Sequence, residues 1–165
     1  MNNAPMDIAT VIHHYASYDL WANTRIAERL SREPDSVLDV PLKSSFPSLR
    51  ATLMHVRNAH HAWFQRLSGV PPTWPAEPGE AFTSFLKHVY VMNGYALALS
   101  ADELLAEVLY RDLKGNQHMS LRWEALMHAF NHATYHRGQL ITMMRESGLE
   151  EVPGTDLIQY QRSLR

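Results

Sequence analysis

The segment Asn131-His132-Ala-Thr-Tyr-His136-Arg-Gly-Gln139 carries two histidines four residues apart. In an α-helix, a step of four residues leaves two side chains about 40° apart and one turn along the axis. The pair is therefore predicted to share one helix face, at a spacing that lets two imidazoles bind one metal ion. Ala133 stands where a catalytic glutamate would follow the first histidine of a zinc-protease helix, which disfavours that class of enzyme.

Around this segment, apolar residues recur at helical spacing in four stretches, which are residues 7–30, 47–67, 80–99 and 120–147. Residues 69–79 hold four prolines and two glycines and are predicted to be a long crossover. Residues 107–119 indicate a hairpin around Lys114-Gly115-Asn116. The chain is predicted to be all-α: a single-domain four-helix bundle over residues 1–165, with the long crossover between helices 2 and 3 and a small β-hairpin before helix 4.

Smaller features complete this prediction. Ser120 is the expected N-cap of the last long helix. Residues 37–40, with the sequence Val-Leu-Asp-Val, are expected to be strand-like within an irregular connector. The tail, residues 149–165, contains Pro153-Gly154 and is expected to be an irregular cover.

Composition narrows the chemistry that the chain can perform. It has ten histidines and no cysteine in 165 residues, which excludes disulfides, thiolate metal sites and a cysteine nucleophile. With 15 Lys+Arg against 17 Asp+Glu, the net charge of −2 lacks the basic footprint of a nucleic-acid-binding protein. The composition therefore directs attention to imidazole chemistry.

Segments that direct a chain to a membrane are not expected. The first seven residues lack the basic and apolar regions of a signal peptide. No run of apolar residues approaches the length needed to span a bilayer. We therefore expect a soluble, cytoplasmic protein without a membrane partner.

A third histidine is a candidate partner of the pair. His55 lies within Leu53-Met-His55-Val, in the apolar stripe of residues 47–67, and helix bundles place metal sites between facing helices. Three neutral imidazoles with an open fourth position match a catalytic type of zinc site. Spacing alone also allows the ordinary alternative, in which these histidines are hydrogen-bonded core or surface residues.

Several motifs together resemble the DinB-like family, metal-binding four-helix-bundle proteins related to bacterial thiol transferases. They are Tyr18-Asp-Leu-Trp21-Ala-Asn23, Leu53-Met-His55-Val with Trp63 and Arg66-Leu67-Ser-Gly69, His128 with residues 131–139, and Pro153-Gly-Thr155-Asp156-Leu-Ile-Gln-Tyr160. The resemblance covers nearly the whole chain. It implies that His55, His132 and His136 bind a divalent metal such as zinc or nickel, and that the chain forms a homodimer.

The resemblance implies transfer of a small-molecule thiol to an electrophile as the first candidate activity. Because the chain has no cysteine, any thiol must arrive with the substrate. Metal-assisted hydrolysis is the second candidate. A non-enzymatic alternative is a metal-stabilised stress-response or binding module. Neutral imidazoles are required for binding, so metal affinity is expected to fall as the pH drops through about 6.5.

Other histidines near the motifs are expected to stay out of the site. Family members often carry an acidic residue where this chain has His60, so any salt bridge from that position is in doubt. His60 is also about 140° around the helix from His55. His128 lies about 80° from His136, which favours a structural role.

Five more side chains have defined expectations. Arg137 is expected to form a surface salt bridge, with Asp156 or a substrate carboxylate as alternatives, whereas Gln139 could orient a ligand histidine. Trp74 is expected in the core, and Trp21 with Asn23 could line the mouth of the pocket.

Overall fold

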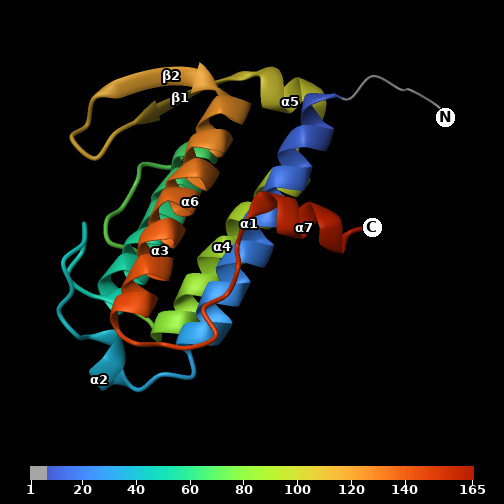
Figure 1. Cartoon of the computed structure of the whole chain (residues 1–165). Helices are drawn as coiled ribbons and strands as arrows, with labels where there is room; N and C mark the ends of the chain where they lie inside the picture. Colours follow the sequence, from blue (N-terminus) through green and yellow to red (C-terminus); the bar gives the residue numbers. More distant parts are fainter. Residues whose placement is uncertain (1–6) are drawn as a thin grey trace.

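A computed structural model describes residues 7–165, which form seven helices and one two-stranded antiparallel sheet (Figure 1). In chain order the elements are α1 (Ile8–Leu30), α2 (Asp35–Leu38), α3 (Leu49–Leu67), α4 (Ala81–Leu97), α5 (Ala101–Leu105), β1 (Glu107–Arg111), β2 (Gln117–Leu121), α6 (Arg122–Glu146) and α7 (Leu157–Ser163). The prediction of a mostly helical chain with a hairpin before the last long helix is confirmed. The first six residues, part of the stretch without signal-peptide features, lie outside the described residues.

The four long helices, α1, α3, α4 and α6, run side by side, with the hairpin and α5 at one end and α2 at the other (Figure 1). Each of α4 and α6 packs against both α1 and α3. Apolar stripes from all four helices meet between them, and Ile12, Leu53, Phe85 and Phe130 are almost completely removed from solvent there. This packing brings one face of α3 against one face of α6.

Local signals place the helix ends. Asp7 caps α1 by accepting a hydrogen bond from the Thr10 backbone N–H at 2.7 Å. Ser48 caps α3 in the same way, through the Ala51 N–H at 3.1 Å. Gly69 follows α3 with φ of 74°, in the left-handed region that glycine adopts without strain. Both ends of α3 therefore lie close to the predicted residues 47–67.

The hairpin forms where the sequence predicts it, with Tyr110 opposite His118. Its turn contains Gly115 with φ of 88°. Ser120, however, lies in β2 and does not cap a helix. Instead α6 begins at Arg122, and the Glu124 carboxylate accepts a hydrogen bond from the Leu121 N–H at 3.0 Å. The expected N-cap was wrong because Ser120 pairs with Val108 in the hairpin.

Two stretches expected to be irregular contain short helices. Residues 35–38 form α2 rather than a strand-like piece, because a helical turn buries Leu38 in the core. The tail forms α7, whose Tyr160 packs on Tyr18 and Trp21 of α1. No helix within residues 7–165 is long and apolar enough to span a membrane.

Candidate metal centre

His55, His132 and His136 lie together between α3 and α6. The Nε2 atom of His132 lies 3.0 Å from Nε2 of His55 and 3.1 Å from Nε2 of His136. One ligand atom from each ring lies within 4.8 Å of the others, and this is the one such cluster of three found in residues 7–165. His136 is buried, and the other two rings are half-buried. The packing of α3 on α6 thus joins residues 77 positions apart in the chain.

Gln139 sets the orientation of His136. Its Oε1 accepts a hydrogen bond from His136 Nδ1 at 2.8 Å, and its amide nitrogen donates to Ser45 Oγ at 2.7 Å. The proton of His136 therefore lies on Nδ1, which leaves a lone pair on Nε2 directed at the cluster. The expectation that Gln139 orients a ligand histidine agrees with this geometry.

The environment keeps the cluster uncharged. Burial, together with the nearby His136, lowers the pKa of His55 from 6.5 to about 4. Burial and the two neighbouring histidines lower the pKa of His132 to about 3. Burial also lowers the pKa of His136, against the opposing hydrogen bond to Gln139. All three rings are therefore neutral near pH 7, the form that binds a metal.

Three neutral rings cannot satisfy one another at these distances. Because Nε2 of His136 is an acceptor, a good contact with His132 requires a proton on His132 Nε2. That proton cannot also serve the contact with His55, so one pair of nitrogens remains without a good hydrogen bond. In addition, His132 Nδ1 is buried without a hydrogen-bond partner. A cation shared by the Nε2 lone pairs would remove this conflict, so the residues present fit a metal ion.

Aromatic side chains frame the cluster, and the sequence did not reveal them. Phe46, in the loop before α3, stacks on His55 with ring centroids 4.1 Å apart. Trp74, in the crossover, meets His55 edge-on at 5.5 Å, and Tyr135 meets His136 at 5.0 Å. Trp74 is 41% exposed, so its expected core position was wrong. The sequence did contain a sign that Trp74 is not a core residue. It lies among the prolines of residues 69–79, where no helix can form to direct its side chain into the core.

Hydrogen bonds to α3 hold the crossover in place. The Thr73 hydroxyl lies 2.9 Å from His61 Nε2, and the Thr73 N–H donates to Gln65 Oε1 at 2.8 Å. Two residues beyond Trp74, the Ala76 N–H donates to Asn58 Oδ1 at 3.2 Å. Trp74 is therefore anchored on both sides beside the cluster.

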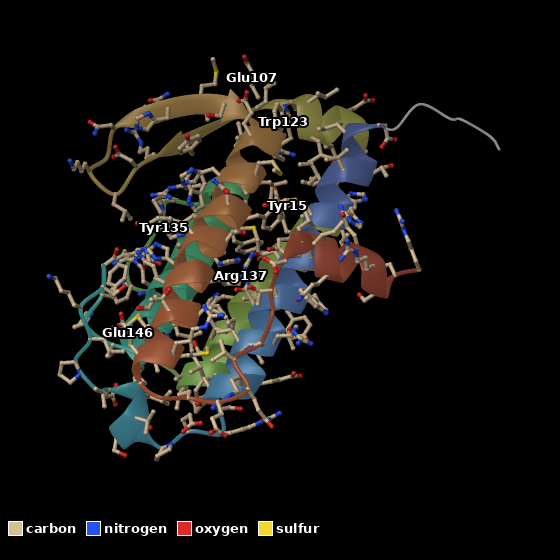
Figure 2. All side chains as sticks on the ribbon, in the orientation of Figure 1. Tyr15, Glu107, Trp123, Tyr135, Arg137 and Glu146 are labelled. Atoms are coloured by element: carbon tan, nitrogen blue, oxygen red, sulfur yellow. The ribbon has the colours of Figure 1, made fainter. Side chains whose placement is uncertain are left out.

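On the other side of α6 lies a buried ion pair. Arg137 donates from Nη1 to Asp19 Oδ1 at 2.5 Å and to Asn23 Oδ1 at 3.2 Å. Figure 2 shows Arg137 directed toward α1 and Tyr135 on a different side of α6. Arg137 is therefore neither a surface salt bridge nor a partner of Asp156, because its guanidinium is enclosed between α6 and α1.

His60 joins this ion pair. Its Nε2 lies 3.0 Å from Asp19 Oδ2 and its Nδ1 lies 3.0 Å from the Val56 carbonyl oxygen, so neither nitrogen is available to the three-histidine cluster. His60 therefore contacts a carboxylate from the position where family members often carry an acidic residue. Burial alone would raise the pKa of Asp19, but the charge of Arg137 and the contacts with His60 hold it below its usual value.

The remaining candidates lie outside the cluster. Asn23 donates to Asp19 Oδ2 at 2.9 Å, and Trp21 packs on Tyr160, so neither lines the mouth of the site. His128 is exposed, packs on Trp63 and has its ring centroid 6.3 Å from that of His132. These positions agree with a structural role for His128.

The fold and the cluster define a class: mostly helical proteins with three histidines from two facing helices, an arrangement compatible with metal binding. Comparison with known families gives a finer assignment. Residues 1–164 match the model of the DinB family, and the chain belongs to that family. The chain is also similar to Protein DinB of Bacillus subtilis (strain 168), with 29% identity over 150 residues that cover 82% of this chain and 86% of the relative.

Proposed function

We propose that the chain is a divalent-metal-binding protein whose ligands are His55, His132 and His136. The observation that carries the proposal is the convergence of three neutral imidazoles on one point. No Asp or Glu of residues 7–165 joins the cluster, so the ligand set contributes no negative charge. Zinc and nickel suit imidazole ligands of this kind. Membership of the DinB family supports the same choice.

The proposed architecture is a single-domain four-helix bundle made of α1, α3, α4 and α6. Its support is the mutual packing of these helices and the match to one family model over residues 1–164. The ligands then lie on two adjacent helices of the bundle, which is where such folds build metal sites. A homodimer and a cytoplasmic location remain predictions.

The activity that we propose is metal-dependent transfer of a small-molecule thiol to an electrophile. When bound, a divalent ion with three neutral ligands supplies the acidity that converts a coordinating thiol to its thiolate. His136, with its proton held on Nδ1 by Gln139, would keep its ring fixed during this chemistry. Phe46, Trp74 and Tyr135 would provide an apolar rim that limits the access of water.

The proposed reaction needs no residue of the chain as nucleophile. The thiol sulfur forms a bond to the electrophilic carbon, the leaving group departs with its bonding electron pair, and the thiol proton passes to solvent. This division of roles agrees with a chain that contains no cysteine.

The test separates the transferase from its two alternatives. Metal-loaded protein is assayed with a panel of thiols against alkyl halide and epoxide electrophiles, and with ester substrates for hydrolysis. Thiol-dependent turnover that disappears in His132→Ala and persists in His128→Ala supports the proposal. Ester turnover without thiol dependence indicates a hydrolase. Stoichiometric metal with a raised melting temperature but no turnover indicates a metal-stabilised binding module.

A further inference from the structure

A second polar feature lies at the far end of α3 from His55. Arg66 is 9% exposed, and it lines a cavity of about 170 Å³ between the end of α3 and the hairpin. It is separated from His55 by eleven residues, which is roughly 16 Å along a helix axis. The cavity is therefore separate from the three-histidine cluster.

The protein leaves the charge of Arg66 incompletely matched. Its Nε donates to the Arg111 carbonyl oxygen at 3.0 Å, and its guanidinium lies over the Trp63 ring at 4.6 Å from the centroid. No carboxylate of residues 7–165 lies within ion-pair distance of it. Burial lowers the pKa of Arg66, and the nearby Tyr110 and Asp112 oppose this only in part.

Asp112 of the same hairpin acts on the charge of Arg66 but does not form an ion pair with it. Its Oδ1 accepts from the backbone N–H groups of Lys114 and Asn116 at 2.8 and 2.9 Å. Its Oδ2 accepts from the Asn116 side chain at 2.9 Å and lies 3.2 Å from His118 Nε2. The carboxylate is thus committed to the turn.

A second buried arginine on α3 shows what a completed site is like. Arg57 donates to Asn58 Oδ1 at 2.8 Å, to Ser84 Oγ at 3.1 Å and to the Ala76 carbonyl oxygen at 3.3 Å. Protein oxygens therefore surround Arg57, whereas the Nη groups of Arg66 make no hydrogen bond within residues 7–165. The Nη groups of Arg66 are not among the enclosed atoms without a partner, so they remain accessible to a group from outside the chain.

The other walls of the cavity define the partner. Val70, Pro71 and Leu109 are apolar, Tyr110 adds an aromatic edge, and Arg111 adds a second positive charge. A planar guanidinium matches the two oxygens of a carboxylate or phosphoryl group. We propose that this cavity binds the oxyanion of a small molecule with a compact apolar body, with Arg66 as the anchoring residue. This site goes beyond the proposed metal function and does not depend on it.

The first test compares ligands and needs no variant. The full chain, with and without added metal, is titrated by calorimetry with isovalerate, its neutral isostere isovaleramide, and inorganic phosphate. We expect isovalerate to bind with a Kd on the order of 1–10 mM, as suits so small a ligand, and the amide to bind at least about tenfold more weakly. Phosphate that binds as tightly as isovalerate would identify a phosphoryl group, and weaker phosphate binding a carboxylate. Equal binding of acid and amide, or binding of neither oxyanion, would overturn the proposal.

The second test uses matched charge removals. Arg66→Gln is expected to weaken oxyanion binding at least about tenfold, whereas Lys114→Gln, which removes the same charge at the hairpin turn, is expected to change it less than about twofold. Arg66→Lys retains the charge but lacks the planar guanidinium. With an intact hairpin, its affinity for the oxyanion should lie between those of Arg66→Gln and Lys114→Gln. Binding that survives Arg66→Gln, or that is lost in His132→Ala, contradicts the assignment. Loss in His132→Ala would place the anion at the three-histidine cluster.

Discussion

Two consecutive residues of α6, His136 and Arg137, belong to polar centres of opposite character. Arg137 donates to Asp19 and Asn23 in a buried network in which His60 also contacts the Asp19 carboxylate. His136 meets two other neutral imidazoles whose nitrogens cannot all be satisfied. In the first centre the charge of Arg137 has a carboxylate partner in Asp19, although Nε of Arg137 makes no hydrogen bond. The second centre has no counter-charge and fits an added cation. One helix thus contributes stability through one face and a candidate binding site through another.

The largest expected effect comes from breaking the buried ion pair between Arg137 and Asp19. Asp19→Ala leaves the Arg137 charge buried without its partner, so the free energy of unfolding should fall by about 3–5 kcal/mol. Urea denaturation measures the change. Asp39→Ala removes a surface partner of Arg50 and should cost no more than about 1 kcal/mol.

The same variant also tests whether the three-histidine cluster is independent of the Arg137–Asp19 ion pair. Asp19→Ala that still folds should bind metal with unchanged stoichiometry, because Asp19 makes no contact with the three histidines. If the variant does not fold, Asp19→Asn keeps the shape of the side chain and replaces it in the metal measurement. A loss of stability below about 1 kcal/mol would show that the network is not a matched ion pair.

The next effect concerns the hydrogen bond between Gln139 and His136. Gln139→Leu removes the acceptor for His136 Nδ1–H, so the metal affinity should fall by about 10- to 100-fold. Gln139→Glu keeps an acceptor oxygen and should retain affinity within about tenfold of the wild type. Competition with a chromophoric chelator measures both. An unchanged affinity in Gln139→Leu would mean that this hydrogen bond does not hold the ring.

The last expected effect is the pH dependence of the metal-free protein. The pKa values of His55 and His132 are lowered to about 4 and about 3, against about 6.5 in an unfolded chain. Between these values the unfolded chain binds more protons, so stability is full above about pH 6.5 and falls as the pH drops toward 4. The melting temperature of chelator-treated protein should follow this course. Metal binding should also persist below pH 6.5, further than the sequence alone suggests.

The double variant His55→Asn/His132→Asn tests the origin of this dependence. It should lower the slope of melting temperature against pH, because two shifted groups are removed. An equal slope in the double variant would assign the pH dependence to other groups.

Periodic parts of the molecule were predictable from the sequence. The spacing of apolar residues predicted α3 and α6, and the four-residue step between His132 and His136 predicted that both lie on one helix face. Both patterns can be recognised within a few neighbouring residues. His55 was a candidate through its apolar stripe and through the family resemblance. The three rings do lie together, although the bound metal is still a proposal.

Contacts without a local signal could not be predicted. Arg137 and Asp19 are 118 residues apart, and nothing in either segment shows which helices will pack together. Phe46 and Trp74 lie in loops, where no period indicates the direction of a side chain. The short helices α2 and α7 form because tertiary packing buries Leu38 and Tyr160, which local propensity does not show.

The most direct measurement is the metal content of untagged protein, titrated with zinc or nickel after chelator treatment. The wild type is expected to bind one divalent ion per chain, and His132→Ala to lose this binding while remaining folded. His128→Ala, one helical turn away on α6, is expected to bind as the wild type does. Absence of stoichiometric binding by the wild type, or equal binding by His132→Ala, would contradict the three-histidine metal centre.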